Sequence, residues 1–186
     1  MLALRRLPRR VAIFYLRASV LALLLRDRVT LRCVTRPAEL ATLLERSRGY
    51  RAVVELGTGP AWTSTALALA DDQRQVVTFD PNVLAHRPRY LALVGAEVRS
   101  RIDFHRARGE DEPPTGLSVD FVFIDSSHKR EPTIATFHNW EPVLRSGGIV
   151  AFHDYGNPQW PGVREAVGSL GLEGEELPYI FFWRKP

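Results

Sequence analysis

The sequence predicts a single α/β domain in which a doubly wound, mainly parallel sheet is covered by helices on both faces. Three observations support this fold class. Strand-like and helix-like segments alternate along most of the chain. The runs AVVEL, QVVTF, VDFVFI and GIVAF are apolar at nearly every position, as strands of a sheet buried on both faces must be. The length of 186 residues suits one domain with one substantial core.

The first predicted helix of this domain begins at Pro37. In AELATLLERSRG, Leu40, Leu43 and Leu44 recur at helical spacing and Gly49 is placed to end the helix. We then expect strands at 52–56, 75–79, 102–105, 119–125 and 148–153, and helices at 63–70, 88–94, 133–144 and 162–170. The closing EELPYIFFWRKP leaves no room for a helix, so it predicts a C-terminal antiparallel strand pair around Pro178.

The positive charge of the chain is concentrated at its start. Nine arginines against one aspartate give residues 1–36 a formal charge of +8, so the rest carries −4 of the total of +4. A mildly acidic body disfavours a nucleic-acid-binding protein, which would need a basic face on the body itself. We therefore divide the chain into a basic and apolar helical arm, 1–36, and a domain, 37–186.

The arm contains a fifteen-residue apolar run, VAIFYLRASVLALLL, with Arg17 near its middle. This run is too short to cross a bilayer, and no small-residue cleavage site follows it, so neither a spanning helix nor a secretory signal is favoured. Two interpretations stay open: the helix packs on the domain or on a second subunit of a homodimer, or it lies on an anionic membrane surface. We expect a cytoplasmic protein, with peripheral membrane contact as the second case. The single cysteine, Cys33, is expected to be buried.

The loop in ELGTGPAW is typical of a ligand-binding turn between a strand and a helix. Gly57 and Gly59 allow the backbone to approach a ligand, while Trp62 stands where a dinucleotide fingerprint has its third glycine. Asp80 ends the second strand, where a carboxylate can accept hydrogen bonds from ribose hydroxyls. Together these features predict a cofactor that carries a nucleoside.

The ordered set ELGTG, VVTFDP, VDFVFIDSSHK and LRSGGIVAFHDY, followed by PGVREAV, resembles the class I S-adenosylmethionine-dependent methyltransferases. The resemblance is to the small-molecule O-methyltransferase branch with FIDxxH and GG…HD motifs, and it extends from about Ala38 to the C-terminus. It implies a Rossmann-like fold, S-adenosylmethionine as cofactor, and methyl transfer to a hydroxyl of a small molecule. By this resemblance the cofactor would be bound by Glu55, Gly57, Thr58, Gly59, Asp80, Ala107, Arg108 and Asp125.

Two departures from the family pattern concern the cofactor site. Many members have another glycine near the positions of Pro60 and Ala61, so this loop is expected to be stiffer. Near the adenine, HRARGED replaces the more usual glycine and acid.

The reacting side of the site is predicted where two further strands end. In metal-dependent catechol-type members, an acid at the position of Asp125 binds magnesium and a lysine three residues later acts as base; this chain has His128 there. A neutral imidazole is a suitable base near pH 7. His153 and Asp154 end the next strand, so a divalent ion, Mg²⁺ or another, would take Asp125, His153 and Asp154 as ligands. Without metal, Asp154 could orient His153 as a base, and His128, His153 and Asp154 are therefore the predicted catalytic residues.

The pattern leaves three other functions open. The chain could be a related hydroxylase on the same fold, a nicotinamide enzyme, or a non-catalytic cofactor-binding domain. The catechol-type pattern also has acid then amide where this chain has His153 and Asp154. Trp160 and Pro161 follow this pair, in a region where related enzymes close over substrate. No spacing rule connects these residues to a particular substrate.

Overall fold

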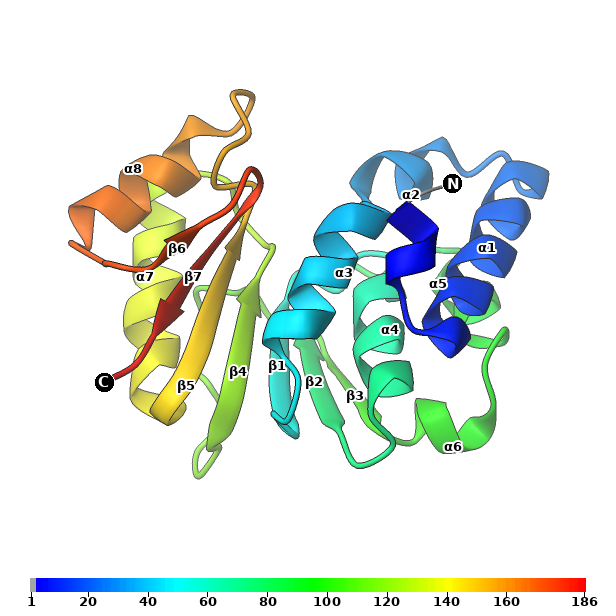
Figure 1. Ribbon diagram of the computed structural model, residues 1–186, viewed down its shortest axis with the longest axis horizontal. Helices are drawn as coiled ribbons and strands as arrows, with labels where there is room; N and C mark the ends of the chain where they lie inside the picture. The colour runs from blue at the N-terminus through cyan, green and yellow to red at the C-terminus, as the bar shows by residue number, and fades with distance from the viewer. Residues whose placement is uncertain (1–2) are drawn as a thin grey trace.

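The computed structural model, which describes residues 3–186, confirms the predicted α/β fold with one mixed sheet (Figure 1). Seven strands follow the order β3-β2-β1-β4-β5-β7-β6. The first five are parallel to one another, and the predicted C-terminal pair is antiparallel, with β7 placed between β5 and β6. The strands are β1 (Ala52–Leu56), β2 (Gln75–Phe79), β3 (Ile102–His105), β4 (Val119–Ile124), β5 (Leu144–His153), β6 (Glu175–Glu176) and β7 (Ile180–Arg184).

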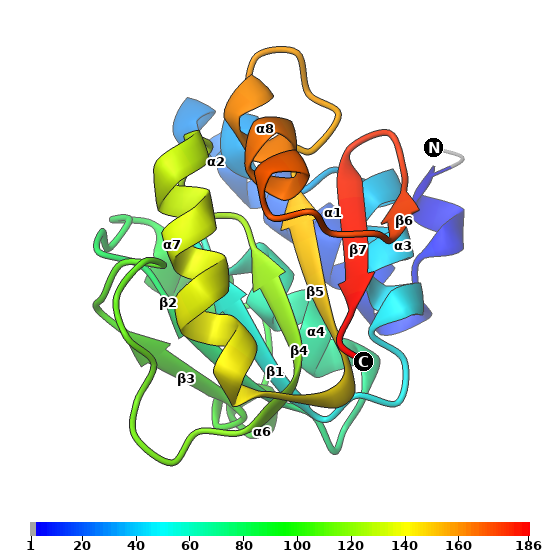
Figure 2. The same cartoon turned by 90° about the vertical axis from the view of Figure 1, so that its left-hand side faces the viewer.

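Helices cover both faces of the sheet. α1, α3 and α4 lie on one face and share a core with it, while α7 and α8 cover the other face (Figures 1 and 2). Because residues in a strand alternate between faces, Val53 packs under the first group and its neighbour Val54 under the second. The helices are η1 (Ala3–Arg6), α1 (Arg9–Leu24), α2 (Arg28–Cys33), α3 (Pro37–Arg46), α4 (Trp62–Ala70), α5 (Arg87–Leu91), α6 (Ala96–Arg99), α7 (Arg130–Trp140), η2 (Glu141–Val143) and α8 (Pro161–Ser169).

Several predicted bounds are wrong: the helix expected at 88–94 is α5, which ends at Leu91, and the largest differences lie between α7 and β5. The helix expected at 133–144 is α7, which begins at Arg130 and ends at Trp140, while Leu144 already opens β5. Pro142 explains the early end, because proline has no N–H to donate to the carbonyl of His138, four residues before it, and the chain passes through the short η2 instead. Strand β5 is therefore four residues longer at its start than the 148–153 expected.

Strand register brings the candidate functional residues to one edge of the sheet. Leu56 pairs with Phe79 of β2 and with Ile124 of β4, and Ile124 pairs with Phe152 of β5. The residues that follow these strands therefore emerge side by side at their carboxyl ends. This is where ligands bind in open α/β sheets.

The N-terminal arm packs on the domain through its inner side. Phe14 and Tyr15 on α1 both pack against the indole ring of Trp62 on α4 in T-shaped contacts. The ring centroids of Phe14 and Trp62 are 6.3 Å apart, and those of Tyr15 and Trp62 are 5.1 Å apart. Within the described residues, no helix is both long and apolar enough to cross a membrane. The expectation of a buried Cys33 is wrong: this residue ends α2 and is exposed, because it lies on the side of the helix that faces a pocket.

Candidate active site

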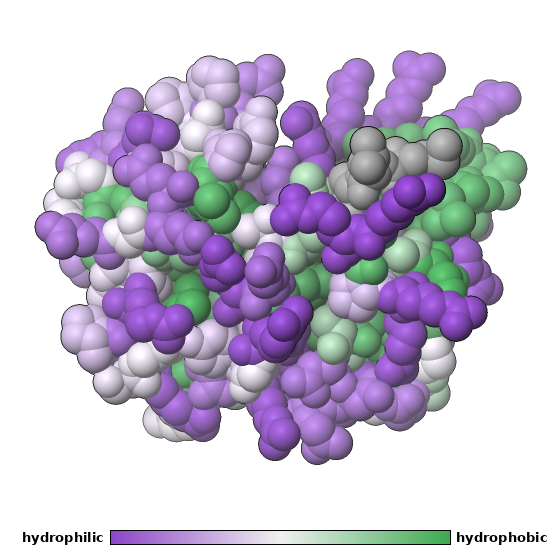
Figure 3. Space-filling model, in the orientation of Figure 1, coloured by the Kyte–Doolittle hydropathy of each residue, from purple (hydrophilic) through white to green (hydrophobic). Residues whose placement is uncertain are grey.

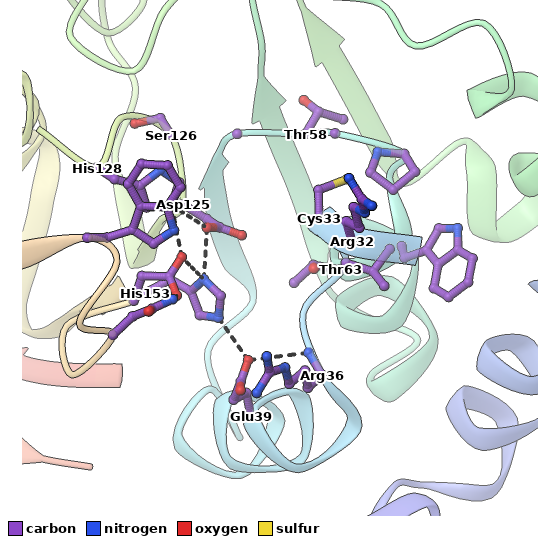
Figure 4. Close-up of a pocket in the computed structure, with 18 of the residues that line it drawn as sticks. Arg32, Cys33, Arg36, Glu39, Thr58, Thr63, Asp125, Ser126, His128 and His153 are labelled. Atoms are coloured by element: carbon purple, nitrogen blue, oxygen red, sulfur yellow. Dashed lines mark hydrogen bonds and ion pairs between the residues drawn. The ribbon is translucent and has the colours of Figure 1, made fainter. Parts of the chain in front are cut away.

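A pocket of about 480 Å³ lies at the carboxyl ends of the strands (Figure 4). Its size falls in the range of small-molecule and cofactor sites. The end of α2 and the start of α3 form one wall, the loop after β1 forms the floor, and the segments after β4 and β5 form the opposite wall. Eight of the predicted site residues line it: Gly57, Thr58, Gly59, Asp80, Asp125, His128, His153 and Asp154.

The two glycines of the ELGTG loop serve different purposes. Gly57 has a φ of 110°, and a Cβ there would lie 2.0 Å from the backbone oxygen of Asp125, so only glycine lets these two strand ends approach. Gly59, with a φ of 49°, has no other described atom within 4 Å of that position and leaves space open. Ala61, near which the resemblance led us to expect a glycine, adopts a φ of 65°, a left-handed conformation that L-residues rarely take.

Asp80 holds the glycine loop in place. Its two carboxylate oxygens accept hydrogen bonds from the backbone N–H groups of Gly59, at 2.8 Å, and Asn82, at 2.7 Å. Each oxygen keeps a free lone pair, so the carboxylate can still accept ribose hydroxyls. Arg87, which sequence reasoning did not identify, donates from Nε to the backbone oxygen of Gly59 at 2.8 Å and lies 3.7 Å from Asp80. No motif marks this arginine, because its role depends on a contact across 28 residues.

Three predicted cofactor residues do not line the pocket. Glu55 is buried behind the loop, where its carboxyl accepts hydrogen bonds from Ser64 and Thr78. Burial raises the pKa of Glu55 to about 8, against the opposing effect of these hydroxyls. Ala107 packs into the core, and Arg108 is exposed, its N–H donating to Asp111 at 2.8 Å. Their roles at the adenine stay a prediction.

Two buried polar atoms in the pocket lining have no hydrogen-bond partner among residues 3–186. They are Oγ of Ser126, which follows Asp125, and Nε1 of Trp62, at the start of α4. A buried polar group without a partner is costly and calls for a ligand or water to satisfy it. Because both atoms are themselves shielded from solvent, a ligand in the open pocket would not contact them directly. The fit to a polar cofactor rests instead on the open space beside Gly59 and on the carboxylate of Asp80.

On the opposite wall, His128 lies between two acids. Its Nε2 is 2.9 Å from Oδ2 of Asp154 and 3.9 Å from Oδ1 of Asp125. The ring stacks on Trp160 with centroids 4.5 Å apart, which fixes its plane. Although burial opposes ionisation, hydrogen bonds from His128, His153 and Asn157 and the charge of His153 hold the pKa of Asp154 well below its usual range.

His153 is occupied on both of its ring nitrogens. Nδ1 lies 2.9 Å from Oδ1 of Asp125, and Nε2 lies 3.0 Å from Oε2 of Glu39, as the dashed lines in Figure 4 show. Burial alone would lower the pKa of His153, but the charge of Asp125 and hydrogen bonds to Asp125, Asp154 and Glu39 raise it well above the ordinary value. Both ring nitrogens of His153 thus face carboxylate oxygens in this arrangement, and its roles as base and as metal ligand stay predictions.

The acids are instead grouped with His128. Ligand atoms of Asp125, His128 and Asp154 all lie within 4.8 Å of one another, close enough to share one cation. The predicted ligand set, with His153 as its imidazole, thus differs by one residue from the set that the structure brings together. Glu39, the partner of His153, was not predicted. One sequence feature could have drawn attention to Glu39. It lies three residues after Arg36, at the start of α3, where its carboxylate caps the helix by accepting a hydrogen bond from the N–H of Arg36.

Comparison with known proteins shows the family to which the sequence of this chain belongs. A family described as "Methyltransferase domain" matches residues 54–155, which include the glycine loop, Asp125, His153 and Asp154. An uncharacterised protein of Acanthamoeba polyphaga mimivirus is 33% identical over 75 residues, 38% of this chain and 33% of that protein. The chain thus aligns with about a third of the length of this curated relative.

Solved structures share the fold at low sequence identity. The TDP-rhamnose 3'-O-methyltransferase of calicheamicin biosynthesis is 20% identical, with a TM-score of 0.62 and coverage of 86% of this chain and 84% of that one. The O-methyltransferase of tomaymycin synthesis from Streptomyces achromogenes, solved with S-adenosylmethionine, is 18% identical, with a TM-score of 0.64 and coverage of 83% and 82%. A methyltransferase from Geobacter sulfurreducens is 15% identical, with a TM-score of 0.66 and coverage of 88% of each chain.

Proposed function

Because the chain belongs to the methyltransferase domain family, we propose that it transfers the methyl group of S-adenosylmethionine to a hydroxyl of a small molecule. The observation that carries the proposal is the contact of His128 Nε2 with Asp154 Oδ2, at 2.9 Å, in the same pocket as the glycine loop and Asp80. The residues that we assign to a nucleoside-bearing cofactor thus face those that we assign to proton transfer. The match to the methyltransferase domain family supports this choice over a nicotinamide enzyme, and solved O-methyltransferases share the fold.

The cofactor would be held by the loop from Gly57 to Gly59 and by Asp80. Bound S-adenosylmethionine supplies an electrophilic methyl group on a sulfonium. Asp80 would accept the ribose hydroxyls with its free lone pairs, and Gly59 leaves room beside the backbone for the ligand. The chain contributes mainly position, which can supply much of the rate of an in-line transfer.

His128 is the residue best placed to take the proton of the substrate hydroxyl. The imidazole would accept the proton that the hydroxyl loses when its oxygen takes the methyl group from the sulfonium sulfur, so that S-adenosylhomocysteine and the methyl ether would be the products. Asp154 would orient the ring and stabilise its charged form, and Trp160 would hold its plane by stacking. His153 would keep Asp125 and Asp154 in place rather than act as a base.

A second version of this step uses a divalent cation. The three ligand atoms of Asp125, His128 and Asp154, within 4.8 Å of one another, favour it, since carboxylates and imidazole suit such an ion. A bound cation would lower the pKa of a substrate hydroxyl. His128 would then bind the cation through Nε2, and the cation would displace the proton that Nε2 shares with Asp154.

The test measures transfer of labelled methyl groups from S-adenosylmethionine to a panel of catechols and hydroxylated sugars. We expect His128→Ala to abolish transfer while binding of S-adenosylhomocysteine is kept. His138→Ala, an exposed histidine on α7 outside the pocket, is the matched control and should change neither. Cofactor binding without transfer to any acceptor would instead support the non-catalytic alternative.

Chelation separates the two versions. If a cation is required, a chelator and Asp125→Asn both stop transfer, and added Mg²⁺ or Mn²⁺ restores the chelated enzyme. If His128 acts alone, the chelator has no effect.

A further inference from the structure

The outer side of α1 is apolar and open to solvent. A helix that is apolar on both sides is ordinarily buried on both, yet here only the inner side packs on α4. Leu23 and Leu24 are 65% and 76% exposed. Figure 3 shows hydrophobic surface gathered over this helix at the right of the molecule. We call the exposed apolar residues of α1 and the adjoining α2 the α1–α2 face: Ile13, Leu16, Val20, Leu23, Leu24, Val29 and Leu31.

Arginines without acidic partners surround the α1–α2 face. No acidic side chain of residues 3–186 lies within ion-pair distance of five exposed arginines: Arg9, Arg17, Arg26, Arg28 and Arg32. The one acid in this part of the chain, Asp27, is already bound by Thr30 and by the hydroxyl of Tyr90. The face therefore combines apolar surface with uncompensated positive charge.

This combination disfavours a second copy of the chain as the partner. A two-fold contact places the same patch against itself, so the arginines around both copies would be brought together. With no acid on the face to pair with them, like charges would repel. An anionic lipid surface is complementary in both respects, because its headgroups pair with arginine and its acyl region accepts leucine and isoleucine.

We propose that the α1–α2 face is a docking surface for anionic lipid membranes. Helix α1 lies in the interface with its outer leucines in the acyl region, and the flanking arginines contact the headgroups. Because Arg32 and Cys33, at the end of α2, also line the pocket, the docking face adjoins the candidate active site. This proposal does not depend on the reaction that the pocket carries out.

The test is flotation of the full chain with vesicles of phosphatidylcholine, with and without phosphatidylserine. We expect binding only when phosphatidylserine is present, weakening as salt is raised. Each arginine near such a surface contributes about five-fold to partitioning, so the triple variant Arg9→Gln, Arg17→Gln, Arg28→Gln should bind roughly 100-fold more weakly. Leu23→Ser with Leu24→Ser should also lose binding.

A matched triple variant removes the same charge elsewhere: Arg48→Gln, Arg51→Gln and Arg99→Gln, all exposed and outside the face. It should bind vesicles within about two-fold of the unaltered chain, since these arginines are screened from the docked surface by distance. Unchanged thermal unfolding of every variant shows that folding is intact. Equal losses in both triple variants, or a dimer in sedimentation that Leu23→Ser disrupts without any vesicle binding, would overturn the proposal.

Discussion

Glu39 on α3 accepts a hydrogen bond from His153 at the end of β5, with 3.0 Å between Oε2 and Nε2 and 114 residues between them in sequence. Both side chains are almost fully buried. The other ring nitrogen of His153 faces Asp125 at 2.9 Å, so the imidazole bridges two acids. This bridge ties the helix that follows the N-terminal arm to the reacting side of the pocket.

The first prediction concerns this bridge. Glu39→Ala leaves a buried N–H of His153 without an acceptor, so we expect it to lower the free energy of unfolding by about 1–3 kcal/mol. Glu39→Gln keeps an oxygen that can accept the same hydrogen bond and should cost less. Urea unfolding of both variants measures the difference. Equal stability of Glu39→Ala and the unaltered chain would mean that the bridge contributes nothing.

Gly57 gives the second prediction. A methyl group there would meet the backbone oxygen of Asp125 at 2.0 Å, so Gly57→Ala must push the strand ends apart. We expect a loss of stability of about 1–3 kcal/mol beyond the cost of the left-handed backbone itself, together with loss of S-adenosylhomocysteine binding.

Gly116→Ala is the matched control for Gly57. Gly116 also has a positive φ, 81°, but no described atom lies within 4 Å of its added methyl. The control should therefore show only the backbone cost, about 1–2 kcal/mol, measured in the same urea series. If both variants lose the same stability, the close approach to Asp125 does not matter.

The grouping of candidate site residues at the carboxyl ends of the strands could be predicted from the sequence, because it follows from the regular geometry of a parallel sheet. Strands that are apolar at nearly every position are typical of a buried parallel sheet, and parallel strands end at one edge, so Asp80, Asp125 and Asp154 were expected together. Strand β1 matched its predicted bounds because an apolar run is bounded on both sides by polar or glycine residues.

Which acids each of the two histidine rings contacts could not be predicted in the same way. Adjacency in space does not say where a ring points, and His153 turns toward Glu39, a residue on a helix that no spacing rule connects to it. That contact occupies Nε2 of His153, whereas Nε2 of His128 lies 2.9 Å from Oδ2 of Asp154. Asp154 follows with a φ of 58°, a backbone turn that no sequence pattern announces.

The third prediction tests the cofactor side. Asp80→Ala removes the carboxylate that accepts the N–H groups of Gly59 and Asn82 and that would accept the ribose hydroxyls. Hydrogen bonds to a charged group contribute about 1.5–3 kcal/mol, so calorimetry should show at least about ten-fold weaker binding of S-adenosylhomocysteine. Asp103→Ala removes the same charge from an exposed position on β3 and should leave affinity unchanged. Weakening by both variants alike would point to general electrostatics instead.

The fourth prediction concerns Glu55 and pH. Burial raises its pKa to about 8 in the folded chain, whereas an unfolded glutamate ionises near 4.3. Between these values the unfolded state has lost the proton and the folded state has kept it. The free energy of unfolding should therefore fall as pH rises from about 5 to about 8, and the contribution of this residue should be fully present only below that window.

Glu55→Gln isolates this effect. The amide can still hydrogen-bond to Ser64 and Thr78 but cannot ionise, so its stability should vary less with pH over the same window. The variant should gain on the unaltered chain at each step from pH 5 to pH 8 in urea unfolding. Parallel curves of unfolding free energy against pH for the two proteins would show that Glu55 ionises normally. The interpretation of Glu55 as a neutral, buried carboxyl behind the glycine loop would then be wrong.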